Sequence, residues 1–212
     1  MQESRSHTSE SHTSESHTSE HAVDEIDRAR VQEYALLATL LSRSPDTQMI
    51  GRLALLRGDA SPLGVAHAAL GEAARRMNED NLGREYFDLF VGLGGGLLSP
   101  YASHYLTGSL YGRPLARLRE TLGHLGIEKA AERSEPEDHA AILCEIMAGL
   151  VGGGITAAAG ADREFFEKHL APWIRRFFVD LEHAQSADFY ARVGALGRIF
   201  IEVETEAYAL SA

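Results

Sequence analysis

The sequence predicts an all-α protein, a single-domain helical bundle that follows a disordered N-terminal tail. From residue 24 onward apolar residues recur at spacings of three and four, as they do along the buried face of a helix. No segment shows the alternation of apolar and polar residues that is typical of a half-buried strand. The chain has 212 residues, 44% of them hydrophobic, which is enough for one substantial core. We therefore expect a tail over residues 1–23 and one helical domain over residues 24–212.

The tail is predicted from its composition. Residues 6–20 repeat SHTSE three times and contain no apolar residue, so burial cannot offset the entropy that ordering this backbone would cost. Histidines of the tail could hold a divalent metal ion only loosely, because a flexible segment must first be ordered. These histidines are His7, His12, His17 and His21. A solvated spacer is the interpretation we favour.

The first helices are indicated by apolar stripes and by capping residues. The stripe that starts the domain ends near Pro45 and consists of Ile26, Arg30, Tyr34, Leu37 and Leu41. A short helix over residues 47–56 follows. The third helix is expected to begin after Ser61 as its N-cap, with Pro62 at the first helical position, and to reach Met77.

The second half of the chain predicts further helices in the same way. Residues 83–92 read as a helix that enters a glycine-rich loop, with Phe87 in the core. Helices are then expected over residues 113–126, 135–151, 162–183 with a kink at Pro172, and 187–209. The last helix presents one apolar face made of Phe189, Val193, Leu196, Phe200, Val203 and Ala207.

Charge and cysteine content indicate a protein of the cytoplasm that does not bind nucleic acid. The formal net charge is -11, and an acidic surface repels phosphates. The single Cys144 cannot form an internal disulfide, and no repeated Cys/His spacing indicates a zinc site. No apolar run is long enough for a membrane span, and the N-terminus lacks the pattern of a secretory signal.

The stretch SEPEDHAAILCE, residues 134–145, combines acids, a histidine and a cysteine. Ser134 and Glu137 have the spacing of a capping box, which predicts that a helix starts here. On a helix Asp138 and His139 would point about 100° apart, so they would not form a catalytic dyad. Glu135 and His139 would share a face, but two ligands do not make a metal site.

Five segments together resemble the TorD/DmsD/NarJ family of redox-enzyme maturation chaperones, with similarity from about residue 25 to residue 209. They are EYFDLFVG (85–92), PYASHYLTG (100–108), RPLARLRETLGHLGI (113–127), EPEDH (135–139) and FYARVGALGRIFIEVETEA (189–207). The second segment is similar to the branch of the family that is associated with formate dehydrogenases.

This resemblance implies an all-helical cytoplasmic protein that catalyses no reaction and exists as a monomer or a domain-swapped dimer. Members bind the twin-arginine signal peptide and the apo catalytic subunit of a molybdoenzyme, and hold it back from export until its molybdopterin cofactor is inserted. The resemblance implies no cofactor of the chaperone's own, although guanine nucleotide binding has been proposed for some relatives.

The resemblance also implies which residues contact the signal peptide. They are Tyr34, Tyr86, Leu89, Phe90, Pro100, Tyr101, Tyr105, Pro136, Asp138 and His139. A signal peptide carries arginines before an apolar stretch, so aromatic side chains would supply contact area. Asp138 is expected at the rim of the site, where it could bind an arginine.

An enzymatic alternative remains open from the residues alone. Glu135, Asp138 and His139, together with the Gly92–Gly96 loop, could belong to a small hydrolase or a nucleotide-binding protein. The loop lacks the strand and the Lys-Ser/Thr pair of a phosphate-binding motif. We therefore favour a flexible loop, and the chaperone over the enzyme.

Overall fold

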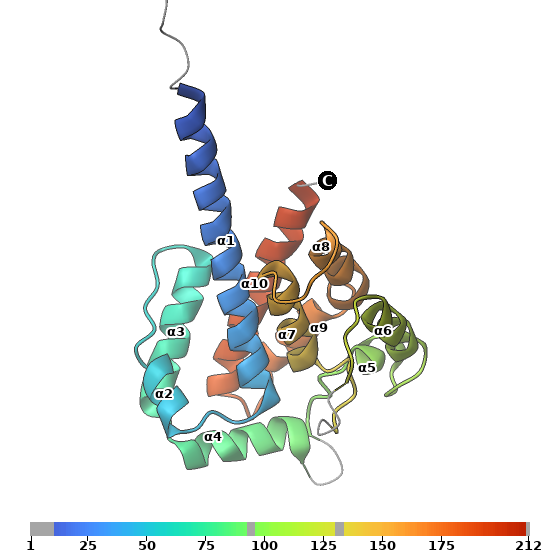
Figure 1. The fold of residues 1–212 in the computed structure, drawn as a ribbon. Coiled ribbons are helices and arrows are strands. Elements are labelled where there is room, and N and C mark those ends of the chain that lie inside the picture. Colours follow the sequence, from blue (N-terminus) through green and yellow to red (C-terminus); the bar gives the residue numbers. More distant parts are fainter. Residues whose placement is uncertain (1–10, 93–95, 130–133, 211–212) are drawn as a thin grey trace, which may run out of the picture.

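The computed structural model describes residues 11–92, 96–129 and 134–210, with side chains from residue 25 onward. Within these ranges every regular element is a helix, and the one β-bridge joins Tyr101 and His139 without forming a strand. The predicted all-α class is therefore confirmed (Figure 1).

The helices follow one another through short connections. Their bounds are α1 Ser11–Ser42, α2 Thr47–Leu53, α3 Pro62–Arg76, α4 Glu79–Tyr86, the π-helical turn η1 Phe87–Val91, α5 Ala102–Thr107, α6 Arg113–His124, α7 Ala140–Val151, α8 Ala161–Phe165, the π-helical turn η2 Phe166–Leu170, α9 Ile174–Glu182 and α10 Phe189–Leu210. Helix α3 begins where the sequence predicts, because the Ser61 side chain accepts the Gly64 N–H at 3.0 Å and Pro62 follows it. The chain also breaks near Pro172, between η2 and α9.

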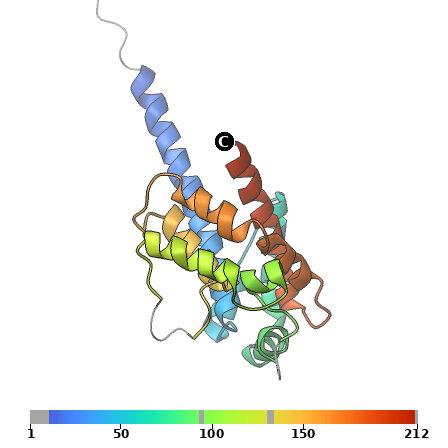
Figure 2. The same cartoon turned by 90° about the vertical axis from the view of Figure 1, so that its right-hand side faces the viewer.

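The core forms where long helices pack in pairs. Helix α1 lies along α7, and α10 packs against both α9 and α3 (Figure 1). Leu37, Leu143, Phe178 and Leu196 come from four of these helices and are fully buried. A second view shows α6 and the α8–η2 segment on the face turned to the viewer (Figure 2). His169 of η2 and Thr121 of α6 connect them through a 2.8 Å hydrogen bond.

The N-terminal repeats, predicted as a disordered tail, are described only from Ser11 onward. Helix α1 begins at Ser11, so the backbone of residues 11–23 is helical, and this part of α1 projects beyond the rest of the molecule (Figure 1). The repeats contain neither glycine nor proline, so a helix nucleated by the packed part of α1 can extend through them. Residues 1–10, the tail histidine side chains and residues 93–95 of the glycine loop lie outside the described part. The domain boundary at residue 24 stays a prediction.

Four apolar side chains assigned to buried faces are exposed, namely Ile26, Phe87, Val203 and Ala207. Ile26 lies near the projecting part of α1 and is 61% exposed, and Phe87 is 43% exposed at the start of η1. A π-helical turn holds more residues than an α-helical one, so it rotates Phe87 outward while Leu89 stays buried. Val203 is 47% exposed, because the buried face of α10 continues through Glu204 and Tyr208.

Candidate functional site

Residues 134–139 form a turn, and α7 begins only at Ala140. The N-cap is His139, whose Nδ1 accepts the Ala141 N–H at 3.1 Å. Glu137, the acid of the predicted capping box, instead accepts two hydrogen bonds from Arg119 of α6, at 3.0 and 2.8 Å. The predicted helix start at residue 135 is therefore wrong, because an imidazole cap and an ion pair replace the local cap.

The turn is joined by its backbone to the segment that precedes α5. The Ala102 N–H donates to the Asp138 carbonyl at 3.0 Å, and the Ala140 N–H donates to the Pro100 carbonyl at 2.8 Å. Between these bonds Tyr101 and His139 face each other in an antiparallel bridge, with ring centroids 5.1 Å apart. PYASH and EPEDH, separate in the sequence, thus form one unit.

Asp138 lies on the interior side of this unit. Its side chain is fully buried, and its Oδ2 accepts the Ser103 N–H at 2.8 Å in the first turn of α5. Oδ1 has no hydrogen-bond partner in the described part of the chain. The expectation that Asp138 meets an arginine at an exposed rim is therefore wrong, since its backbone position turns the carboxyl group inward.

His139 lies on the other side and is held in one tautomer. Burial lowers the pKa of His139 to about 4, so the ring is neutral at pH 7. Because Nδ1 accepts the Ala141 N–H, the ring proton must reside on Nε2. Among the described residues no acceptor is bound to Nε2, which makes this N–H an available donor.

A groove of about 520 Å3 lies between α1 and α7, with His139 in its wall. Ala35 and Ala38 of α1 face Ala141 and Ala148 of α7 across it. Because these side chains are small, two closely packed helices leave a depression between them. The depression is open to a chain or a ligand with apolar side chains.

One end of the groove is acidic and aromatic. Glu135 lines this end near Tyr86, whereas Glu145 of α7 lines the groove between Ala141 and Ala148. The Tyr101 hydroxyl donates to Glu135 Oε2, and burial together with this carboxylate raises the pKa of Tyr101. Glu135 is thus a fixed, exposed carboxylate. Tyr86 packs against Phe90 at 5.1 Å between ring centroids and donates to the Leu41 carbonyl at 3.2 Å.

The structure brings together only part of the predicted contact residues. Tyr86, Tyr101 and His139 surround the acidic end of the groove, Phe90 supports Tyr86, and Pro136 lies in the adjoining turn.

The other predicted residues lie elsewhere. Leu89 and Pro100 are buried, and Tyr34 is buried with its hydroxyl bound to Glu204 at 2.8 Å. Tyr105 faces α9, where its hydroxyl donates to Asp180 at 2.9 Å. The opposed alanines were missed, because only the packing of α1 on α7 shows that these residues face each other.

Of the side chains in the enzymatic alternative, Glu135 and His139 line the same groove, but Asp138 does not join them. Asp138 points into the interior and His139 toward the groove, while the centre of the glycine loop lies outside the described residues. Cys144 is fully buried, and burial raises the pKa of its thiol to about 12, so it is not a nucleophile at neutral pH.

The described residues offer neither a cluster for a metal ion nor a helix that could span a membrane. Three or more His, Cys, Asp or Glu side chains that could hold a metal ion do not come together there. Nor is any helix in that part of the chain long and apolar enough to cross a membrane.

Comparison with known proteins identifies the family. Residues 57–179 match the family model described as the nitrate reductase delta subunit. The chain belongs to this family, which confirms the predicted resemblance to the TorD/DmsD/NarJ group.

Individual relatives agree with this result. A chaperone protein TorD from the El Tor Inaba strain of Vibrio cholerae is 29% identical over 130 residues, which cover 57% of this chain and 59% of that protein. A TorD from the Classical Ogawa strain is 28% identical over 194 residues, covering 85% of this chain and 82% of the relative. A crystal structure assigned as a redox enzyme maturation protein from Archaeoglobus fulgidus has a similar fold, with a TM-score of 0.53, 22% identity and coverage of 82% and 93% of the two chains.

Proposed function

We propose that this protein is a cytoplasmic chaperone that binds the twin-arginine signal peptide and the apo catalytic subunit of a molybdopterin-dependent oxidoreductase. It would assist cofactor insertion and delay export, and it would catalyse no reaction itself. Family membership and the relatives named TorD support the chaperone role. The observation that carries the peptide-binding part is the α1–α7 groove with an acidic end.

The groove matches the two chemical features of such a peptide. Its apolar stretch can lie against the opposed alanines, where burial of apolar side chains is favourable. The preceding arginines can approach Glu135, whose carboxylate suits the planar guanidinium. The Nε2–H of His139 can donate to a carbonyl oxygen of the bound backbone. Tyr86 then supplies aromatic contact area beside these groups.

Calorimetric titration of the full chain with synthetic signal peptides tests the proposal. A formate dehydrogenase leader is the first choice because of PYASHYLTG, residues 100–108. We expect saturable binding of a twin-arginine leader, and weaker binding when both arginines are replaced by lysine. If the folded protein binds neither any leader nor any apo-subunit, the proposal is wrong.

A matched pair of variants locates the binding site. Glu135→Gln should weaken leader binding by about tenfold, because one charge-assisted contact is lost. Glu206→Gln removes the same charge from an exposed position of α10 and should bind like the wild type. Equal affinities for the two variants would show that the leader binds outside the groove.

A further inference from the structure

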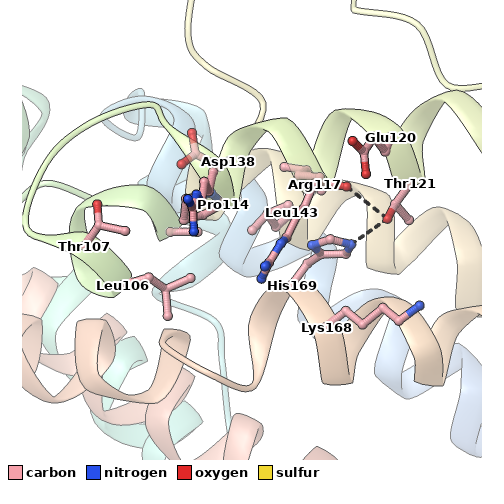
Figure 3. A pocket seen from close by; sticks show the side chains of 13 residues that line it. Leu106, Thr107, Pro114, Arg117, Glu120, Thr121, Asp138, Leu143, Lys168 and His169 are labelled. Atoms are coloured by element: carbon pink, nitrogen blue, oxygen red, sulfur yellow. Dashed lines mark hydrogen bonds between the residues drawn. The ribbon is translucent and has the colours of Figure 1, made fainter.

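A second pocket, of about 660 Å3, lies between α5, α6 and η2. Figure 3 shows Leu106 and Thr107 at one end, Lys168 at the other, and Arg117 between them. Its volume is in the range of ligand sites in proteins. Asp138 lines this pocket and its neighbour His139 lines the α1–α7 groove, so the two cavities lie on either side of the same turn.

The mouth of the pocket carries unpaired positive charge. Arg113 and Arg117 are one turn apart on α6, and both are exposed. In the described part of the chain neither guanidinium has a hydrogen-bond or ion-pair partner, whereas Arg119 on the same helix is paired with Glu137. Two free arginines on a protein of net charge -11 form a local site for anionic groups.

Three exposed apolar residues precede these arginines in the sequence, and we call them the apolar edge. Leu106, Leu110 and Tyr111 are 44%, 42% and 57% exposed. Tyr111 has φ 69°, a left-handed conformation that is unfavourable for a large side chain. Its N–H is held by Ser103 Oγ at 3.0 Å, and the Ser103 N–H is held in turn by Asp138. The fold therefore keeps this aromatic residue outside the core despite the strain.

The carboxyl groups of the pocket restrict the anionic ligand. Asp138 and Glu120 both line the pocket, and Asp138 Oδ1 has no hydrogen-bond partner among the described residues. Both would repel phosphates, whereas a peptide spaces its carboxylates apart and has N–H donors between them. We propose that the pocket and its apolar edge bind an acidic peptide segment, with carboxylates on Arg113 and Arg117 and an apolar side chain against Leu106.

Selection of a random dodecapeptide library on the full chain, followed by synthesis of the consensus peptide, tests this inference. We expect the selected peptides to be rich in Asp and Glu beside leucine or aromatic residues. The consensus peptide should bind at least about tenfold more weakly to the double variant Arg113→Glu/Arg117→Glu, and to wild type when its own acids are replaced by amides. Both arginines are exposed, so circular dichroism should show an intact fold.

A control variant distinguishes the effect of charge within the pocket from the effect of the overall net charge on peptide binding. Arg28→Glu/Arg192→Glu makes the same change in net charge at exposed positions outside the pocket, and it should bind the consensus peptide like the wild type. Equal binding to both double variants, selection of peptides without acidic enrichment, or no selected peptide would each overturn the inference. Binding of a twin-arginine leader by Arg113→Glu/Arg117→Glu should be no weaker than binding by the wild type, since the change only adds negative charge, so the inference and the proposed function can fail independently.

Discussion

At the scale of single residues, the backbone conformation of His139 determines which cavity each side chain of the turn lines. Its φ and ψ are -68° and 137°, an extended conformation rather than a helical one. Side chains that succeed each other in extended backbone point to opposite sides. Asp138 therefore lines the α5–α6 pocket while His139 lines the α1–α7 groove. With a helical start at residue 135 these two side chains would instead point only about 100° apart.

The low pKa of His139 predicts a loss of stability in mild acid. In the folded protein the ring stays neutral until about pH 4, whereas in the unfolded chain it is protonated below about pH 6.5. Between these values protons bind preferentially to the unfolded chain, so the free energy of unfolding falls as the pH is lowered, by about 3 kcal/mol in total. Urea unfolding at a series of pH values measures this loss.

His139→Asn is the matched variant for that experiment. Asparagine is a good N-cap and can accept the Ala141 N–H in place of Nδ1, but it does not titrate. The variant should keep its stability at pH 7 to within about 1 kcal/mol and lose about 3 kcal/mol less than wild type between pH 6.5 and pH 4. An equal loss in both proteins would show that other groups cause the acid sensitivity.

The residues of this turn also show which features of the structure cannot be predicted from the sequence. Ser134 and Glu137 have the spacing of a capping box, and local pattern alone favours a helix there. The structure differs because Arg119 binds Glu137 and because the backbone of Pro100 and Ala102 pairs with the turn. Those contacts join segments far apart in the chain, so no local pattern reveals them. The resemblance to a family singled out Tyr101 and His139, and the structure places these two side chains in contact. Their part in peptide binding stays a prediction.

At the scale of the helices, a buried ion pair joins α1 to α10. Glu204 of α10 is 1% exposed and accepts from Arg30 Nε at 2.8 Å, from Arg30 Nη2 at 2.9 Å and from the Tyr34 hydroxyl at 2.8 Å. Glu204→Ala should lower the free energy of unfolding by about 3 to 5 kcal/mol, because it leaves a part-buried guanidinium without its main partner. Urea denaturation measures the change.

Two further variants test that explanation. Arg30→Met/Glu204→Leu should be less destabilised than Glu204→Ala, although it changes two residues, because no buried charge is left unpaired. Asp27 and Asp162, which also pair with Arg30, are partly exposed to solvent. Glu202→Ala, on the same helix but paired with the more exposed Arg175 and Arg198, should change stability by less than about 1 kcal/mol. A double variant that is as unstable as the sum of its single variants would contradict this account.

Helices were predictable wherever their signals are local. Ser61 and Pro62 mark the start of α3, and the apolar stripe of residues 189–200 marks the buried face of α10. The predicted stripe continued to Val203 and Ala207, and both residues are exposed, because Glu204 takes the inward position to meet Arg30. The π-helical turn at Phe87–Val91 has no signal in the sequence that distinguishes it from an α-helix, so the exposure of Phe87 could not be foreseen.

At the scale of the whole molecule, net charge and local geometry should contribute differently to leader binding. A protein of net charge -11 attracts any basic peptide over distances comparable to the Debye length, about 10 Å at 0.1 M salt and 3 Å at 1 M. This attraction acts on association and does not distinguish arginine from lysine. Discrimination must come from contact with a carboxylate such as Glu135, where only the guanidinium can make two parallel hydrogen bonds.

Association and dissociation rates of leader peptides test this division. Raising the salt concentration from about 0.1 M to 1 M should lower the association rate constant by about tenfold for the twin-arginine and the twin-lysine leader alike, with a smaller effect on dissociation. Replacing arginine by lysine should instead speed dissociation at either salt concentration. Surface plasmon resonance gives both constants. If the two leaders differed in association but dissociated equally fast, arginine would be selected before the bound contacts form, and Glu135 would have no special part in recognition.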